Sequence, residues 1–429
     1  MSPIADRPCA LSRRRLLQQF GLLLSCYLQP PALLAQTAPE VTADGFRILR
    51  PGQSGTSSPE PLCTYDGAFP GPLLRVKRGE ELKIRLVNGL GEATAIHWHG
   101  VRLPNAMDGA PPLTQPAVAP GGSFEYRFAP PDAGTFWYHA ATPAQRARGL
   151  AGVLIVDETE RLDVGQEFTL IFQDAPGTAS ATGEAARPSA GALRVNGAPS
   201  MDIPVRAGRL RLRLVNASLQ LLPSIRIGTL RSWVMAIDGE PAEPFMARDS
   251  QVALGPGNRI DLFVDVDAEG PVSIVLSDAA KEAHQIARLT VQPAAAGASS
   301  LAGPRPLPNN PLPARMDFPG ALKADIALGG AVAELGSRPL FSIARGRTAM
   351  LALVNRSDRP QVTHVHGHHF RLLDRLDDGW KPFWLDTVLV PPRETQRIAF
   401  VADHSGKWLI DCHATAEPRA TPPGWFEVR

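Results

Sequence analysis

Six of the ten histidines fall into spacings that suit a metal ion. His97 and His99 lie in the segment IHWHG, and His364 and His366 lie in THVHG. Side chains two residues apart in a strand point to the same face, so each pair presents two imidazoles to one space. Neutral imidazoles at this spacing suit copper, zinc, iron or nickel. The two pairs therefore indicate a transition-metal site.

Two further histidines follow the pairs, His139 in GTFWYHAA and His413 in GKWLIDCHA. Aligning these segments sets Asp411 level with His139, and Ala141 level with His413. The alternative for any one pair is a hydrogen-bonded histidine pair in a core. Two matched pairs, each with a further histidine downstream, favour metal instead. The other four histidines are expected to be structural or surface residues: His284, His368, His369 and His404.

The elements that must position these histidines recur three times. Each copy combines a turn glycine, an alternating strand and a final asparagine, in VKRGEELKIRLVN, VRAGRLRLRLVN and IARGRTAMLALVN. In the middle copy leucines alternate with arginines over 209–214, which predicts a half-buried antiparallel strand. The asparagines Asn88, Asn216 and Asn355 lie 128 and 139 residues apart, a spacing that fits one β-sandwich per repeat.

Length and composition agree with this organisation. The 429 residues allow about three domains. The 38 glycines and 42 prolines separate short apolar runs, a texture that favours strands over long helices. A formal charge of +2 supplies no basic surface for nucleic acid. The expected domains span 40–160, 161–293 and 314–429, with an Ala/Gly/Pro-rich linker over 294–313.

These segments resemble the laccase-like multicopper oxidases, a family of three cupredoxin domains exported to the bacterial periplasm. The matching stretches include FPGPLLRVKRGEELKIRLVNGL, AIHWHGVRLPNAMDGAPPLTQ and AGTFWYHA in the first repeat, and HVHGHHFRLLDRLDDG, WLDTVLVPP and ETQRIAF in the third. The resemblance implies an all-β fold of three consecutive cupredoxin-like Greek-key β-sandwich domains. It also implies copper as the cofactor and oxygen as the electron acceptor.

The resemblance further implies a trinuclear copper site between the first and third domains, held by eight histidines. The chain supplies six of them. His97 and His364 match type 2 copper ligands, and His99, His139, His366 and His413 match type 3 ligands, while Ala141 and Asp411 stand at the other two positions. A carboxylate can still ligate a metal, so Asp411 is a candidate ligand, whereas Ala141 has no ligand atom.

The electron-entry, type 1 copper site that the resemblance implies is largely lost. Such a site needs two imidazoles, a thiolate and a weak axial ligand. Cys412 matches the thiolate, but Gln361 and Glu417 stand at the histidine positions and Pro422 at the axial methionine. The alternative is that Cys412 is a buried thiol of ordinary reactivity.

Asp108, in NAMDG, matches an acidic group that the family places beside the copper cluster to relay protons to oxygen. The alternative is that Asp108 only orders the turn before Gly109. The sequence thus favours a copper-binding oxidoreductase by ancestry with weak or absent laccase-type turnover, and leaves open whether it is an enzyme. If active, it would use a small-molecule or metal-ion reductant and oxygen. The alternative is a SufI-like, non-catalytic periplasmic scaffold that binds a protein partner without copper.

The N-terminus predicts export. Residues 1–35 contain SRRRLLQ followed by a short apolar stretch, a pattern typical of a twin-arginine signal peptide. The apolar stretch is too short and interrupted to span a bilayer, so we expect no transmembrane anchor and a periplasmic protein. The segment LLSC, ending at Cys26, loosely resembles a lipoprotein cleavage site, which is the alternative.

Overall fold

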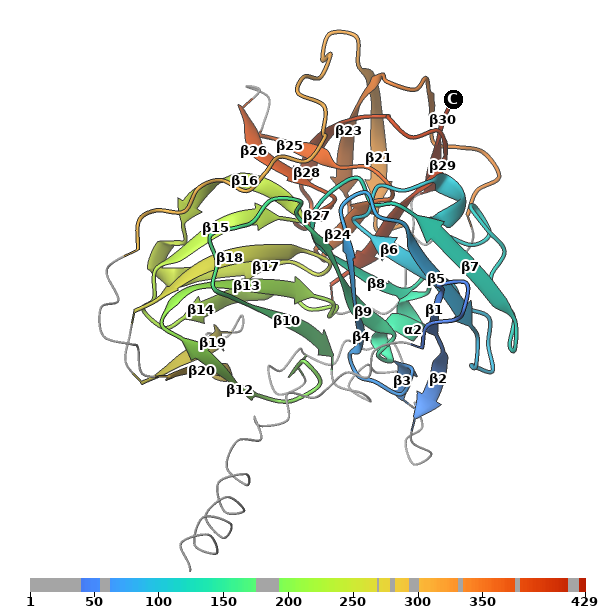
Figure 1. The fold of residues 1–429 in the computed structure, drawn as a ribbon. Coiled ribbons are helices and arrows are strands. Elements are labelled where there is room, and N and C mark those ends of the chain that lie inside the picture. Colours follow the sequence, from blue (N-terminus) through green and yellow to red (C-terminus); the bar gives the residue numbers. More distant parts are fainter. Residues whose placement is uncertain are drawn as a thin grey trace, which may run out of the picture. The chain divides into compact units, whose positions relative to one another are not determined.

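Strands make up nearly all of the regular structure (Figure 1). The computed structural model describes residues 40–54, 62–174, 193–267, 270–277, 282–292, 301–330, 335–374, 379–415 and 424–429, all within one unit, Ala38–Arg429. In these residues the short helical segments are η1 (Asn105–Met107), α2 (Pro143–Ala147) and η3 (Arg248–Ser250). The predicted all-β fold is confirmed. The predicted signal peptide lies outside the described residues.

The first group of strands encloses a core that includes Trp98, Tyr126 and Phe136. Its sheets have the strand orders β1-β5-β7, β2-β3 and β4-β9-β8-β6. The strands are β1 (Arg47–Leu49), β2 (Pro51–Ser54), β3 (Leu62–Tyr65), β4 (Gly71–Lys77), β5 (Leu82–Val87), β6 (Ile96–His99), β7 (Ser123–Phe128), β8 (Gly134–Ala140) and β9 (Ala151–Asp157).

The second group has the orders β11-β10-β13-β18-β15-β16 and β12-β20-β19-β14-β17, around an aliphatic core. The strands are β10 (Gln166–Asp174), β11 (Leu193–Val195), β12 (Met201–Arg206), β13 (Gly208–Asn216), β14 (Leu222–Ile227), β15 (Ser232–Ile237), β16 (Glu240–Met246), β17 (Gln251–Leu254), β18 (Arg259–Val266), β19 (Pro271–Ser277) and β20 (Ala283–Gln292).

The third group has the orders β21-β23-β28-β25-β26 and β22-β30-β29-β24-β27, around a core that includes Trp408 and Phe426. The strands are β21 (Leu322–Leu328), β22 (Ser342–Ile343), β23 (Thr348–Asn355), β24 (Gln361–Val365), β25 (Phe370–Asp374), β26 (Gly379–Leu385), β27 (Thr387–Val390), β28 (Thr395–Val401), β29 (Gly406–Ala414) and β30 (Gly424–Val428). The domain boundaries drawn from the sequence stay a prediction.

The recurring sequence segment forms the same unit in all three sandwiches. β5, β13 and β23 each pair in parallel with an earlier strand (β1, β10 and β21) and antiparallel with a later one (β7, β18 and β28). The asparagine that follows or ends each strand donates from Nδ2 to the carbonyl four residues later: Asn88 to Glu92, Asn216 to Gln220 and Asn355 to Arg359, at 2.9, 2.8 and 2.8 Å. The side chain thus holds the turn that closes each strand, which explains why asparagine recurs there.

The middle copy differs from its sequence prediction. We expected the arginine face of β13 to meet solvent, but Arg211 and Arg213 are buried, and that prediction is wrong. Asp261 on β18 accepts hydrogen bonds from both, at 2.6 and 3.0 Å, and Arg213 also donates to Thr135 of the first sandwich at 2.6 Å. Apolar residues of β8 and β9 pack on those of β10 and β13, so the first sandwich covers this face. Alternation reveals the polarity of a face but not what covers it.

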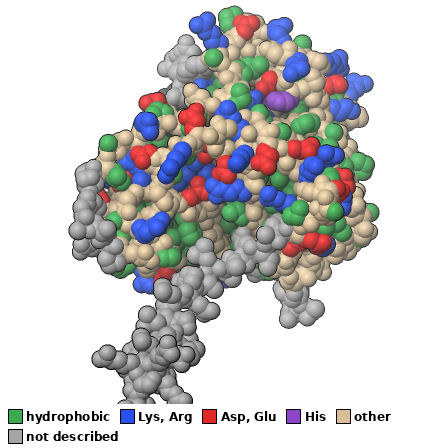
Figure 2. Space-filling model, in the orientation of Figure 1, with side chains coloured by type: hydrophobic (Ala, Val, Ile, Leu, Met, Phe, Trp, Pro, Cys, Tyr) green, Lys and Arg blue, Asp and Glu red, His purple; other side chains and the backbone are tan. Residues whose placement is uncertain are grey.

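The surface carries no single-sign field on the face drawn in Figure 2, where basic and acidic side chains are interspersed. This agrees with the small formal charge of +2. Among the residues that the structure describes, no helix has the length and apolar character to cross a membrane.

Candidate metal centre

Two sheets carry the predicted histidines. In the first sandwich β6 holds His97 and His99, and β8 pairs with it so that His97 faces His139 across the ladder. In the third sandwich His364 lies on β24, and His366 follows that strand directly. Strand periodicity therefore aims both imidazoles of each pair to one side.

The two pairs meet between the sandwiches. The Nε2 atoms of His97 and His364 lie 3.2 Å apart. The ring of His99 stacks on that of His364 with centroids 3.8 Å apart, and the rings of His97 and His366 have the same centroid distance. All four side chains are buried. The structure thus brings together the residues that the sequence placed on one seam.

The facing nitrogens of His97 and His364 both carry lone pairs. Nδ1 of His97 lies 2.8 Å from the carbonyl oxygen of Asp108, and Nδ1 of His364 lies 2.9 Å from that of Asp386. A carbonyl only accepts, so each Nδ1 must hold the proton and each neutral ring leaves its Nε2 bare. Two acceptors at 3.2 Å have no proton to share. Two nitrogens bound to one metal ion at a tetrahedral angle would lie about 3.3 Å apart.

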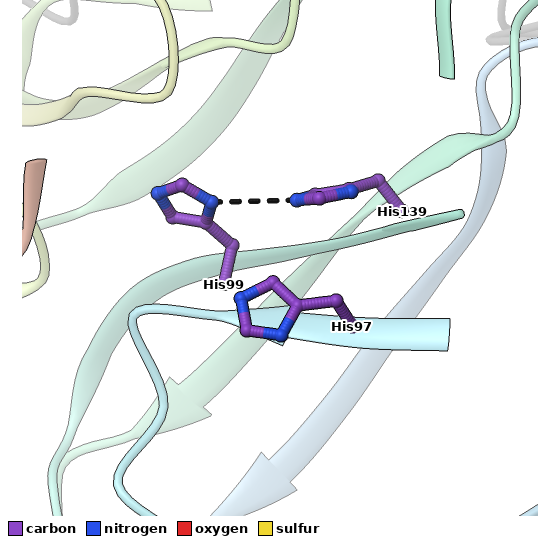
Figure 3. Close-up of side chains that lie close together, drawn as sticks. All are labelled: His97, His99 and His139. Carbon is purple, nitrogen blue, oxygen red and sulfur yellow. Dashed lines mark hydrogen bonds between the residues drawn. The ribbon is translucent and has the colours of Figure 1, made fainter. Parts of the chain in front are cut away.

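His99 and His139 form a second such pair (Figure 3). Nδ1 of His99 lies 3.3 Å from Nε2 of His139, whose own Nδ1 donates to the carbonyl oxygen of Ala140 at 2.8 Å. The other nitrogen of His99 donates to Thr387 Oγ1 at 2.8 Å, because the Thr387 hydroxyl proton goes to Asp386 at 2.7 Å. The facing nitrogens of His99 and His139 are therefore also bare.

Asp108 fixes two of these rings. Its Oδ2 accepts from Nδ1 of His366 at 2.9 Å, and its Oδ1 lies 3.5 Å from Nδ1 of His97. Burial alone would raise the pKa of Asp108, but His366 and His97 hold it below its ordinary value. An ionised Asp108 keeps the proton of His366 on Nδ1 and leaves Nε2 free to bind a metal. The proton-relay role that the sequence suggested stays a prediction.

The ligand atoms form overlapping groups within 4.8 Å of one another. The groups are His97, His99 and His139; His97, His364 and His366; and His99, His364 and Asp386. Burial lowers the pKa of His97, His99 and His139 below the usual range. Neutral imidazole is the form that binds metal, so burial keeps these side chains ready as ligands. The five imidazoles fit copper, which the family resemblance implies.

The sixth histidine faces a cation instead. Arg146, on α2, is buried, and its Nη2 lies 3.3 Å from Nε2 of His413. A guanidinium has only donors, so the lone pair of His413 Nε2 accepts from Arg146. Nδ1 of His413 has no hydrogen-bond partner among the described residues. Burial and then Arg146 lower the pKa of His413 to about 3.

Asp411 lies on the same side of the cluster as Arg146. It faces His364 across the β24–β29 ladder. Burial would raise the pKa of Asp411, but His413, His366 and Arg146 lower it. Its negative charge therefore offsets Arg146 in an interior where an isolated charge would be costly. Ala141 has no side-chain ligand atom to add here.

Cys412 is fully buried on β29, where its thiol contacts Gln361 and Thr363. Its Sγ donates to Oε1 of Gln361 at 3.3 Å, and Thr363 Oγ1 lies 3.8 Å from it. Burial raises the pKa of the thiol to about 12. Gln361 thus lies against the sulfur, at the position where the family resemblance implied a histidine. Glu417 and Pro422 lie outside the described residues.

Sequence reasoning missed three residues that shape the centre: Arg146, Asp386 and Thr387. Asp386 and Thr387 belong to the quoted segment WLDTVLVPP, so their stretch was noticed but not their contacts. Arg146 lies in TPAQRARGL, where no spacing distinguishes it from Arg148. Only the packing of α2 against the cluster reveals it.

Family models for multicopper oxidases match residues 52–161 and 309–417, the two segments that supply all six histidines. The chain belongs to the multicopper oxidase family. It is similar in structure to Lac15 from a marine microbial metagenome, with 33% identity and a TM-score of 0.76 over 89% of this chain and 99% of that chain.

Two relatives of this chain have names that indicate different functions. Multicopper oxidase MmcO of Mycobacterium tuberculosis is 28% identical over 92% of this chain and 91% of its own length. The cell division protein FtsP of Salmonella typhimurium is 29% identical over 77% of each. The chain is therefore similar over most of its length both to a protein named as an oxidase and to one named as a division protein. Only the residues of the metal centre can discriminate between these two functions.

Proposed function

We propose that this protein binds copper on the five imidazoles of His97, His99, His139, His364 and His366, and that laccase-type turnover is weak or absent. One observation carries the proposal: two pairs of bare imidazole nitrogens face each other at 3.2 and 3.3 Å in a buried space. Lone pairs held this close repel unless a cation lies between them. His413, Asp411 and Arg146 form the incomplete side of the partial trinuclear site.

Bound copper would supply the one-electron chemistry by which the family reduces oxygen. The chain's own residues orient the rings: Asp108 and Asp386 accept their outward protons. The residues that the structure describes offer no evident entry for electrons, because the thiol of Cys412 is paired with the amide of Gln361. A small-molecule or metal-ion reductant would therefore deliver electrons slowly.

Metal analysis tests this proposal. Protein expressed with copper and then dialysed should retain one or two copper ions per chain without intense blue colour. His99→Ala or His366→Ala should lower that number, while His284→Ala, on the partly exposed side of β20, should leave it unchanged. Retention of copper by both cluster variants at the full level would reject the shared site. Blue protein that oxidises phenols would contradict the loss of the type 1 centre.

The second candidate function is a scaffold without copper. The likeness to a cell division protein and the cation of Arg146 inside the cluster favour it. The scaffold function with a protein partner would be supported by one result. Protein expressed with copper and then dialysed would retain no copper, yet would melt at the same temperature as protein expressed without copper.

We also propose export through the twin-arginine pathway to the periplasm, on the basis of the SRRRLLQ segment. Arg13→Lys with Arg14→Lys should retain the precursor in the cytoplasm, as measured by cell fractionation. Cys26→Ser should not change the distribution; release from the membrane fraction by that variant would point to the lipoprotein alternative.

A further inference from the structure

A second cluster of metal-ligating side chains lies outside the histidine centre. It contains Asp132, which precedes β8, Glu240, the first residue of β16, and His369, which precedes β25. One residue thus comes from each sandwich. One ligand atom of each lies within 4.8 Å of the others, and all three residues are buried.

Three polar atoms of this cluster lack the hydrogen bonds that burial normally requires. Neither ring nitrogen of His369 has a hydrogen-bond partner among the described residues, and neither has Oε1 of Glu240. Nε2 of His369 lies 3.5 Å from Oε1 of Glu240 and 3.6 Å from Oδ2 of Asp386. Buried polar atoms without partners are rare and destabilise the folded protein. A cation between them would satisfy both residues.

The carboxyl groups around the cluster outnumber the guanidinium groups, so a bound cation would balance the charge. Asp132 accepts two hydrogen bonds of 2.6 Å from Arg102, which also donates to Asp403. Arg259 donates to both oxygens of Asp386, at 3.0 and 2.7 Å. Asp238 also lies 3.6 Å from Arg259, so with Glu240 five carboxyl groups surround two guanidinium groups. Burial, and then Asp132, raise the pKa of Glu240, so ionised Glu240 needs further positive charge nearby.

We propose that Asp132, Glu240 and His369 bind a divalent cation of the manganese or zinc type. Two carboxylates and one imidazole form a harder donor set than the all-imidazole centre, and such ligands suit manganese. Asp386 lies between the two sites, since its Oδ1 is 3.3 Å from His99 Nε2 while its Oδ2 is 3.6 Å from His369 Nε2. The new site does not depend on whether the histidine centre holds copper.

The position of the cation gives it a structural role. Asn310 donates to Glu240 Oε2 and to the carbonyl of Ala133, both at 2.9 Å, and accepts from the amide of Ala133 at 2.9 Å. A side chain at Gly134 would clash with the carbonyl oxygen of Gly239, so the two backbones are in close contact here. A cation held by residues of all three sandwiches would fasten this junction.

The experiment titrates the metal-free full chain with Mn²⁺ and follows bound manganese and melting temperature. The wild type should bind one Mn²⁺ and melt at a higher temperature when it is bound. Glu240→Gln keeps the shape and removes the charge, and it should weaken Mn²⁺ binding at least tenfold. Glu243→Gln is the matched control, because Glu243 is exposed on the same strand. It should behave as the wild type.

His369→Gln is the second variant, and it should weaken Mn²⁺ binding as Glu240→Gln does. Without metal, Glu240→Gln should melt no lower than the wild type, because it removes a carboxyl group from an acidic cluster. The proposal is overturned if the wild type binds no Mn²⁺ or Zn²⁺ at millimolar concentration. It is equally overturned if Glu240→Gln destabilises the protein by the same amount with and without Mn²⁺, since Glu240 would then only be a hydrogen-bonding residue.

Discussion

The two sides of the histidine centre present their imidazoles to different partners. On one side the bare nitrogens of His97 and His364 face each other, an arrangement that needs a cation from solution. On the other side His413 accepts from Arg146, a cation that the chain supplies itself. The second side, which we call the filled side, also lacks two of the histidines that the family resemblance implies, because Ala141 and Asp411 stand at their positions. Arg146 occupies the lone pair of the histidine that remains there, whereas the first, metal-ready side keeps its facing imidazoles.

Charge explains why the two sides behave differently. A guanidinium is permanently protonated and offers only donors, so it can occupy the lone pair of an imidazole as a metal ion would. Arg146 and Asp411 offset each other, whereas Asp411 without Arg146 would be a partly buried carboxylate in need of a cation. We infer that Arg146 reduces the number of copper ions that the centre holds.

The largest effect is expected from breaking the metal-ready side. His97→Ala with His364→Ala removes both members of a facing pair, and bound copper should fall by at least half. Copper per chain after dialysis measures this. His404→Ala, on a partly buried histidine outside the cluster, is the control. Unchanged copper in the double variant would mean that the facing nitrogens do not hold the metal.

The metal-ready side is also the part that the sequence predicted best. Strand periodicity placed the two imidazoles of each pair on one face, and the family resemblance implied that the pairs His97/His99 and His364/His366 share one site. On the other side the sequence named His413 and Asp411 as candidate ligands and showed that Ala141 stands where a histidine is missing. Arg146 left no signal, because its role depends on the packing of α2 and not on a spacing. His369 likewise appeared to be a lone histidine, since its partners Asp132 and Glu240 lie more than a hundred residues away in sequence.

The next effect comes from emptying the filled side. Arg146→Met keeps much of the volume but removes the charge, so His413 Nε2 and Asp411 become available to metal. Bound copper should rise, by up to one ion per chain. Arg148→Met is the matched control, because Arg148 pairs with Glu92 near the surface of the same segment. A copper content equal to that of the wild type would show that Arg146 does not compete with metal.

Acid should destabilise the metal-free protein through both sides. The pKa of His413 is lowered to about 3 by burial and Arg146, and burial also lowers that of His97, His99 and His139. Below about pH 6.5 the unfolded chain binds protons that the folded chain does not, so stability falls as pH falls. Each such histidine contributes up to about 1.4 kcal/mol per pH unit.

His413→Gln isolates the contribution of the filled side to this pH dependence. Urea unfolding between pH 7 and 5 should give a slope smaller than that of the wild type by up to about 1.4 kcal/mol per pH unit. His284→Gln, at a partly exposed position, serves as the control. Equal slopes for His413→Gln and the wild type would mean that His413 titrates normally in the folded protein.

The smallest effect should follow from changing Cys412. Its thiol donates to Gln361 and burial raises its pKa to about 12, so it is not a ready nucleophile at neutral pH. Cys412→Ser keeps a donor toward Gln361, and copper content and visible absorption should match those of the wild type. A thiol reagent should distinguish the two proteins by one thiol only after unfolding. A loss of copper in Cys412→Ser would instead show that the sulfur is part of the metal site. The hydrogen bond between Cys412 and Gln361 would then not keep the thiol from binding metal.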